Sequence, residues 1–245
     1  METTNIKTFL EIPYEKLEEL NLKAREIQSR KIAEEQRRQY LKKEKRIKAI
    51  TICFSDLEGR LHMLDYDKKY FLRSTANLTF DGSSIRGFTV QAESDLRLDP
   101  DWTSFRWLPS DVFGPGKVIM FANVLEKNKK VYQSDFRAKL QKYCADLAKK
   151  NIKTSMGPEI EGFLLEGIDA EQSFDSKVGF KLISTGGYYH SLPLDRLRQF
   201  IDRSAEAQRA MGFKNEKDHP EVAPSQFEMN FSYSDILRAG DNIQL

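Results

Sequence analysis

The chain has 245 residues, of which 40% are hydrophobic and 31% are charged, and its formal net charge at pH 7 is +2. This length allows one large domain or two small ones, and the composition is that of a soluble globular protein with enough apolar material for a core. The nearly balanced charge argues neither for nor against a charged partner. There is no run of about eighteen apolar residues, so we expect no membrane span. Glu2 and Glu11, in an N-terminus without an apolar stretch, count against a signal peptide.

The two cysteines, Cys53 and Cys144, are far apart in the sequence and do not have a metal-binding spacing. Cys144 lies on the apolar stripe of an amphipathic helix expected over residues 135–150, which favours a buried thiol over a reactive one. Free thiols fit a reducing, cytoplasmic setting.

Residues 1–45 differ from the rest of the chain. From Tyr14 to Lys48 the sequence is dense in Glu, Lys, Arg and Gln and contains no glycine, which favours a helix. A short apolar stripe follows helical spacing and then gives way to polar residues: Leu17, Leu20, Ala24 and Ile27. We interpret this segment as a solvated helical extension. The alternatives are a docking helix for a partner chain and a basic nucleic-acid contact, which the interleaved acids disfavour.

A strand period begins at Ile47, and a turn at residues 55–59 predicts a hairpin into residues 60–64. Further strands are expected over residues 103–108 and 117–124. The second of these is apolar on both faces, as a central strand would be. Between these strands lies Asp81-Gly82, which by itself is an ordinary turn dipeptide.

Residues 154–166 are predicted to form a strand, whose side chains alternate between its faces. Glu159 and Glu161 therefore share one face, about 6.7 Å apart. Two carboxylates on an otherwise apolar strand repel each other and lose hydration when they are buried. A pair of hard divalent cations is the usual means of offsetting this cost. The alternative is a pair of glutamates on a solvated face.

A second stretch ends in a regular alternation, with Gln226, Glu228 and Asn230 on one face of a strand. The other face is apolar and consists of Phe227, Met229 and Phe231. Glu221 and Glu228 are an odd number of positions apart, and Pro224-Ser225 supplies the break that can bring both to one site. The four carboxylates of the two stretches predict an oxygen-rich site for two Mg²⁺ or Mn²⁺ ions.

Five stretches resemble motifs of the class I glutamine synthetases, and the resemblance covers about residues 46–245. They are Phe80-Asp81-Gly82-Ser83-Ser84-Ile85-Arg86-Gly87-Phe88, Glu93-Ser94-Asp95-Leu96-Arg97-Leu98-Asp99-Pro100-Asp101, Gly157-Pro158-Glu159-Ile160-Glu161-Gly162-Phe163-Leu164, Gly186-Gly187-Tyr188-Tyr189 and Glu221-Val222-Ala223-Pro224-Ser225-Gln226-Phe227-Glu228. Five motifs in the family's order are far more specific than any one alone.

The resemblance implies an α+β fold. The charged helical extension (1–45) would precede a small β-grasp-like N-terminal domain (46–134) and the first part of a catalytic domain (135–245), an antiparallel sheet with helices. A helix marked by apolar residues from Leu194 to Met211 is expected to stop at Gly212. The family continues for roughly as many residues again beyond this chain, so we expect a truncated protein.

The resemblance also implies an activity, the ATP-dependent ligation of ammonium to glutamate through γ-glutamyl phosphate, with Mg²⁺ or Mn²⁺, in a homo-oligomer. Glu161, Glu221 and Glu228 would hold the ion nearest glutamate and ammonia, and Glu159 would contribute to the ion on the ATP phosphates. Asp81 would reach the active site of the neighbouring subunit, bind ammonium and accept its proton. The nucleotide and glutamate side would include Tyr188, Tyr189 and Glu216.

Three positions depart from the family pattern. The family usually has two histidines before Glu221, where this chain has His219-Pro220, and the proline could re-aim the glutamate. Ser225 replaces a usual glycine, and Phe227 stands where His or Asn is common. The rest of the family sequence carries the arginines that clamp phosphate, so we expect little or no ligase activity from this chain alone. The alternatives are a non-catalytic relative that assembles with partners and a γ-glutamyl ligase for a different amine or acid.

Overall fold

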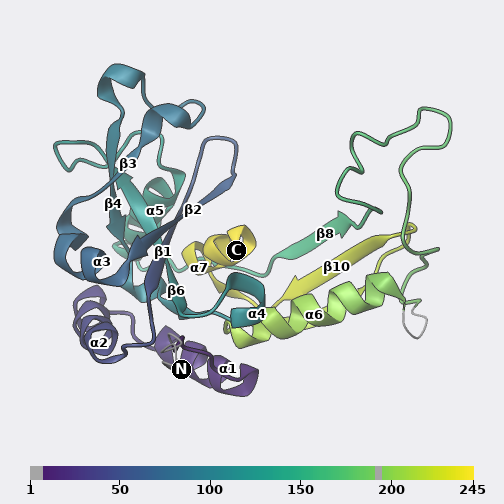
Figure 1. Ribbon diagram of the computed structural model, residues 1–245, viewed down its shortest axis with the longest axis horizontal. Helices are drawn as coiled ribbons and strands as arrows, with labels where there is room; N and C mark the ends of the chain where they lie inside the picture. Colours follow the sequence, from purple (N-terminus) through teal and green to yellow (C-terminus); the bar gives the residue numbers. More distant parts are fainter. Residues whose placement is uncertain (1–7, 191–194) are drawn as a thin grey trace, which may run out of the picture. The chain divides into compact units, whose positions relative to one another are not determined.

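The computed structural model describes residues 8–190 and 195–245, and the chain divides into two compact units (Figure 1). The first unit comprises Met1–Thr154, Ala210–Gly212 and Asp235–Leu245, and the second comprises Ser155–Arg209 and Phe213–Ser234. Among the described residues, no helix is both long enough and apolar enough to cross a membrane.

The first unit is built on a mixed sheet of six strands. They are β1 (Ala49–Ser55), β2 (Leu61–Asp67), β3 (Leu78–Asp81), β4 (Asp95–Pro100), β5 (Arg106–Trp107) and β6 (Lys117–Leu125). The order across the sheet is β2-β1-β6-β4-β3, and β5 pairs with β6. β1 and β6 are parallel, whereas the other pairs are antiparallel. The two central strands, β1 and β6, are buried along almost their whole length, as the apolar sequence of β6 predicts for that strand.

The expected hairpin is confirmed, and its turn is closed by Asp56, whose carboxylate accepts the backbone N–H groups of Glu58 and Arg60. The strand expected over residues 103–108 is mostly wrong. Only Arg106–Trp107 is a strand, and Trp102–Ser104 forms a 3₁₀ helix, η4, whose N-cap Asp101 accepts the N–H of Thr103. The cap favours this short helix because the aspartate side chain satisfies a backbone N–H group that would otherwise have to pair within a strand ladder.

The N-terminal extension consists of two helices, α1 (Tyr14–Arg25) and α2 (Arg30–Lys43). Our interpretation of it as a solvated helix is wrong, because Leu17 and Leu41 are fully buried and belong to the core of the first unit. Asn21 is buried as well, and its side-chain amide pairs with both the N–H and the C=O of Trp107 in β5. The extension is therefore part of the domain core.

Truncating the buried face of α2 should destabilise the chain strongly. We expect Leu41→Ala to lower the free energy of unfolding by about 2–5 kcal/mol, because it removes a fully buried side chain and leaves a cavity. The matched control is Ile32→Ala in the same helix, where the side chain is 51% exposed and the loss should stay below about 1 kcal/mol. Urea denaturation of the two variants measures both values. Equal losses would mean that Leu41 does not pack in the core of the first unit.

Four further α-helices lie in the described part of the first unit. They are α3 (Lys68–Ser74), α4 (Ser110–Phe113), α5 (Phe136–Ala148) and α7 (Ile236–Gln244). The expected helix over residues 135–150 corresponds to α5, whose N-cap Asp135 accepts the N–H of Ala138. The sequence favours a buried thiol for Cys144, but this residue is only half-buried. Ala138 is the residue of α5 that is buried. Cys53 in β1 is fully buried, and burial raises the pKa of its thiol.

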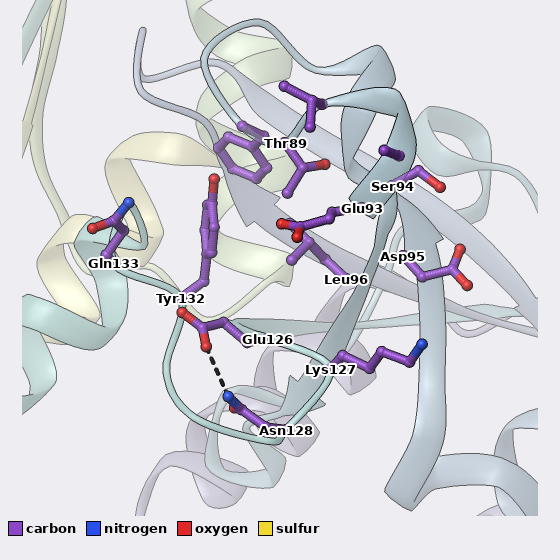
Figure 2. Close-up of a pocket in the computed structure, with 13 residues that line it drawn as sticks. Thr89, Glu93, Ser94, Asp95, Leu96, Glu126, Lys127, Asn128, Tyr132 and Gln133 are labelled. Atoms are coloured by element: carbon purple, nitrogen blue, oxygen red, sulfur yellow. Dashed lines mark hydrogen bonds between the residues drawn. The ribbon is translucent and has the colours of Figure 1, made fainter.

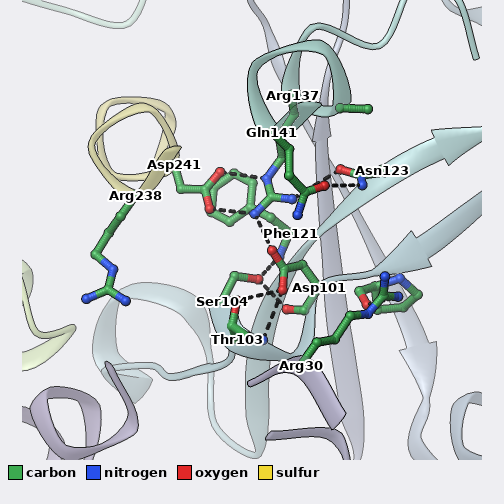
Figure 3. Close-up of polar contacts among 12 residues, drawn as sticks. Arg30, Asp101, Thr103, Ser104, Phe121, Asn123, Arg137, Gln141, Arg238 and Asp241 are labelled. Atoms are coloured by element: carbon green, nitrogen blue, oxygen red, sulfur yellow. Dashed lines mark hydrogen bonds and ion pairs between the residues drawn. The ribbon is translucent and has the colours of Figure 1, made fainter. Parts of the chain in front are cut away.

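A buried group of ion pairs joins α5, α7 and the cap of η4 (Figure 3). The Arg137 guanidinium lies 2.8 Å from Asp101 Oδ2 and 2.7 Å from Asp241 Oδ1, and all three side chains are at most 8% exposed. Burial would raise the pKa of Asp101, but Arg137 and Thr103 outweigh that effect and lower it. Burial raises the pKa of Asp241 despite the opposing effect of Arg137. Arg137 thus compensates two buried carboxylates at once.

The second unit contains a three-stranded antiparallel sheet of order β8-β10-β9. Its elements are β7 (Ser155–Met156), β8 (Glu159–Phe163), α6 (Arg196–Ala210), β9 (Asn215–Pro220) and β10 (Gln226–Phe231), and the short strand β11 (Ser234–Asp235) follows. Helix α6 lies along β10 in Figure 1, and the Phe200 ring packs 5.0 Å from that of Phe227. Gly212 takes a φ of +80° after the last turn of α6, as a C′ residue does. The expected start of this helix at Leu194 lies outside the described residues.

Candidate metal centre

Cross-strand pairing places three acid–base side chains in one row across the second unit. Glu228 in β10 is paired with Glu161 in β8 on one side and with His219 in β9 on the other. Directly opposed residues of antiparallel strands project to the same face of the sheet. The apolar residues that alternate with Glu228 along β10 face α6. The row of three acid–base side chains therefore lies on the other face of the sheet, as the alternation in the sequence predicts.

His219, Glu221 and Glu228 form a compact group. One ligand atom from each lies within 4.8 Å of the others. His219 Nδ1 is 3.7 Å from Glu221 Oε1, and His219 Nε2 is 4.0 Å from Glu228 Oε2. The three side chains are only 9–13% exposed. Two poorly hydrated carboxylates beside an imidazole are costly unless a cation compensates them, so the donor set fits a divalent metal ion.

Asn230 supports this fit. Its side-chain amide nitrogen donates to Glu228 Oε1, and this hydrogen bond lowers the pKa of Glu228, although burial opposes the shift. The Asn230 side-chain oxygen is buried and has no hydrogen-bond partner among the residues that the structure describes. An oxygen with an unused lone pair next to an ionised carboxylate suits a site for a hard cation or its bound water.

The tight turn between β9 and β10 brings Glu221 and Glu228 together. Glu221 directly follows β9, and its N–H donates to the carbonyl of Gln226 at the start of β10. Ser225 in the turn has a φ of +63°, in the left-handed region that favours glycine. Its buried hydroxyl offsets this strain, because it accepts the N–H groups of Ile183 and Ser184 at 2.8 and 3.0 Å. The serine therefore links the turn to the segment that leads to Gly186.

Glu159 and Glu161 share a strand face, but neither belongs to the compact group. Glu161 is Glu228's partner in the register and is exposed, and its Oε2 accepts a hydrogen bond from Gln226 at 2.9 Å. Glu159 lies opposite Asn230, one pair further along, and is also exposed. The structure therefore brings Glu161 beside the group and leaves Glu159 further from it.

Tyr188 and Tyr189 lie against the imidazole of His219. Their rings stack with centroids 3.8 Å apart and lie nearly perpendicular to the His219 ring, with centroid distances of 5.5 and 4.7 Å. A hydrogen bond between the two hydroxyls raises the pKa of Tyr188 to about 12. Glu216 is exposed where the β9–β10 register shifts and does not belong to the compact group.

Asp81 lies in the first unit, at the end of β3. Its carboxylate accepts the N–H and the hydroxyl of Ser83 and the hydroxyl of Ser84. These hydrogen bonds lower the pKa of Asp81, which is fully exposed, so the group is ionised at neutral pH. The turn chemistry holds a carboxylate in a fixed orientation at an exposed loop.

A cleft of about 840 Å³ lies in the first unit, between the segment from Phe88 to Leu96 and the loop from Glu126 to Gln133 (Figure 2). Charges of both signs line it, including Glu93, Asp95 and Lys127. Residues of the first unit alone form this cleft, whereas residues of the second unit alone form the carboxylate group. Because the mixed charges of the cleft select no particular ligand, the compact group of His219, Glu221 and Glu228 is the better guide to function.

Two family models match the chain: the glutamine synthetase β-grasp domain over residues 46–127 and the glutamine synthetase catalytic domain over residues 133–245. The glutamine synthetase of Thermotoga maritima is 32% identical over 202 residues, which cover 82% of this chain and 45% of that protein. The glutamine synthetase of Halobacterium salinarum is 35% identical over 170 residues, which cover 69% of this chain and 36% of that protein. This chain thus spans less than half the length of these curated relatives.

Two solved structures show the same fold. Plasmodium falciparum glutamine synthetase matches with a TM-score of 0.70 and 20% identity, over 85% of this chain and 46% of that one. The structure titled "Apo GmaS without ligand" matches with a TM-score of 0.69 and 24% identity, over 83% of this chain and 47% of that one. The expected α+β architecture, a β-grasp domain followed by part of a catalytic domain with an antiparallel sheet, is confirmed. The chain belongs to the glutamine synthetase family.

Proposed function

We propose that this chain carries part of the active site of an ATP-dependent glutamate–ammonia ligase, with a divalent cation held by His219, Glu221 and Glu228. The observation that supports this most directly is the compact group that these three poorly exposed side chains form on the polar face of the second unit's sheet. Membership of the glutamine synthetase family supplies the reaction. Oxygen-rich ligands favour Mg²⁺ or Mn²⁺.

The proposed reaction has two steps. The γ-carboxylate of glutamate attacks the γ-phosphorus of ATP and releases ADP, and ammonia then displaces phosphate from γ-glutamyl phosphate. A bound Mg²⁺ or Mn²⁺ supplies positive charge that lets two anionic substrates approach. In this proposal Glu161 completes the ligand set beside Glu228, and Glu159 serves the ion on the ATP phosphates. Tyr188, Tyr189 and Glu216 are proposed for the nucleotide and glutamate side.

Asp81 is proposed to bind ammonium and to accept its proton, which leaves ammonia as the nucleophile. The hydrogen bonds from Ser83 and Ser84 support this role, because they keep the carboxylate ionised and fix its orientation. This role requires a homo-oligomer, in which the Asp81 loop reaches the active site of a neighbouring copy.

A coupled assay of ADP release with glutamate, ammonium and Mg²⁺ tests the proposed reaction. Turnover by this chain alone should be low, as expected from the sequence, and should require both substrates; Asp81→Asn should lower kcat further, by about 10²–10⁴-fold, the usual contribution of a general base. The same variant should leave Mn²⁺ affinity unchanged, because Asp81 is not part of the compact group of His219, Glu221 and Glu228. ADP release that does not need glutamate would contradict the ligase assignment. The absence of both turnover and Mn²⁺ binding would favour a non-catalytic relative.

A further inference from the structure

Beside the Arg137 ion pairs, the first unit contains a small cavity of about 60 Å³ lined by arginines. Arg25 comes from the end of α1, Arg106 from β5 and Arg238 from α7. These residues are far apart in the sequence, and the fold brings them to the lining of one small, partly open cavity. A water molecule needs about 10–15 Å³ of such a space, so the cavity can hold a few waters or one small ion but not a nucleotide.

The positive charges in this cavity are unevenly compensated. Arg137 is matched by Asp101 and Asp241, whereas Arg238 Nε lies 3.5 Å from Asp235 Oδ2. Arg106 donates to a neutral acceptor, Asn242 Oδ1, and the charge of Asp241 also acts on its guanidinium. The lining contains four arginines and three aspartates, the fourth arginine being Arg137, which leaves one net positive charge.

Arg25 is the least compensated of these groups. Within the part of the chain that the structure describes, no carboxylate forms an ion pair with it, and its buried Nη2 has no hydrogen-bond partner. Burial and then the charges of Arg106 and Arg238 lower the pKa of Arg25 to about 9, although the charge of Asp235 opposes the shift. Burial likewise lowers the pKa of Arg106 to about 10, although Asp241 opposes the shift. Like charges gathered in a poorly hydrated space destabilise the fold unless an anion offsets them.

We propose that this cavity binds a small tetrahedral oxyanion of the phosphate class, held by Arg25, Arg106 and Arg238. A tetrahedral oxyanion offers acceptors in several directions at once, and guanidinium groups are well suited to donate to it. Singly protonated or doubly protonated phosphate can adjust its charge to the one net positive charge of the lining, which sulfate cannot do. Asp101, Asp235 and Asp241 also line the cavity, and their pairing with Arg137 and Arg238 limits their repulsion of the anion.

The experiment is thermal unfolding of the whole chain, together with calorimetric titration, in millimolar inorganic phosphate at constant ionic strength set with chloride. Phosphate should raise the Tm of the unmodified chain by several degrees, because an anion that binds only the folded state stabilises it. Sulfate should give a smaller rise. Arg25→Met should lose the phosphate response and weaken binding by about tenfold or more, the cost of one charge-assisted hydrogen bond.

Arg25→Met should also be at least as stable as the unmodified chain when phosphate is absent, because it removes a poorly compensated buried charge. The matched control is Arg73→Met, which removes an exposed arginine of α3 in the same unit and should keep the full response. If Arg25→Met does not fold, Arg238→Met is expected to lose the phosphate response in its place. An absent response in the unmodified chain, an equal response in Arg25→Met, or an equal response to added chloride would overturn the proposal. Because the cavity is formed by the first unit alone, none of these outcomes depends on the proposed ligase site.

Discussion

Replacing Arg137 by methionine should destabilise the chain by about 3–5 kcal/mol, the usual cost of removing one partner from a buried ion pair. The substitution leaves Asp101 and Asp241 charged and about nine-tenths buried, with their common counter-ion gone. The two carboxylates would then repel each other as well as lack compensation. Because they belong to the cap of η4 and to α7, we expect both elements to loosen from α5. Urea denaturation followed by circular dichroism measures the loss.

The control for this prediction is Arg30→Met, which breaks the pair between Arg30 and Asp99 near the surface. Here solvent screens the charges, so the loss should be about 0–1 kcal/mol. Adding Asp101→Asn and Asp241→Asn to Arg137→Met should recover much of the lost stability, since neutral amides cost less to bury than unpaired carboxylates. A small effect of Arg137→Met, similar to that of the Arg30 control, would show that the ion pairs are not buried in solution.

Replacing Glu228 by glutamine should lower the affinity of the chain for Mn²⁺ by about a hundredfold or more. The estimate follows from the 10–100-fold losses that substitution of a residue supporting a ligand already causes. Glu228 is central to the site, because it pairs in register with both Glu161 and His219 and receives the hydrogen bond of Asn230. Titration of Mn²⁺, followed by the loss of the electron paramagnetic resonance signal of the free ion, gives the affinities directly.

Three further variants make this result specific. Glu166→Gln, which removes an exposed carboxylate of the same unit that pairs with Arg196, should leave Mn²⁺ affinity unchanged. His219→Asn and Glu161→Gln separate two ligand sets: the compact group predicts the larger loss for His219→Asn, and the carboxylate set inferred from the sequence predicts it for Glu161→Gln. Unchanged affinity in Glu228→Gln would contradict both.

The sequence predicts the polar face of β10 well, because a period of two is a direct consequence of strand geometry. Phe227 and Met229 pack toward α6, and Glu228 and Asn230 lie on the opposite face. The turn at Pro224-Ser225 was also predicted from the local sequence, because a proline interrupts a strand. The fold class followed from ordered motifs rather than from propensity, since such motifs mark backbone features that few folds share.

Features that depend on tertiary contacts were not predictable from the sequence. Leu17 begins a short apolar stripe and Leu41 is an isolated apolar residue, both in a charged segment, and their burial depends on the core of the first unit, which the sequence does not show. His219 was regarded only as a departure from the family pattern, although its spacing of two from Glu221 was a usable signal that both project to one face. The arginine cavity has no sequence signal, because its four arginines come from elements that are far apart in the chain.

The most direct test of the metal centre is a crystal of the chain grown with Mn²⁺ and measured at the manganese absorption edge. The proposal predicts an anomalous difference peak between His219, Glu221 and Glu228, with donor atoms at about 2.0–2.4 Å, the distances of hard-cation coordination. A crystal that contains Mn²⁺ only at other positions, or at none, would contradict the assignment of these residues as a metal site.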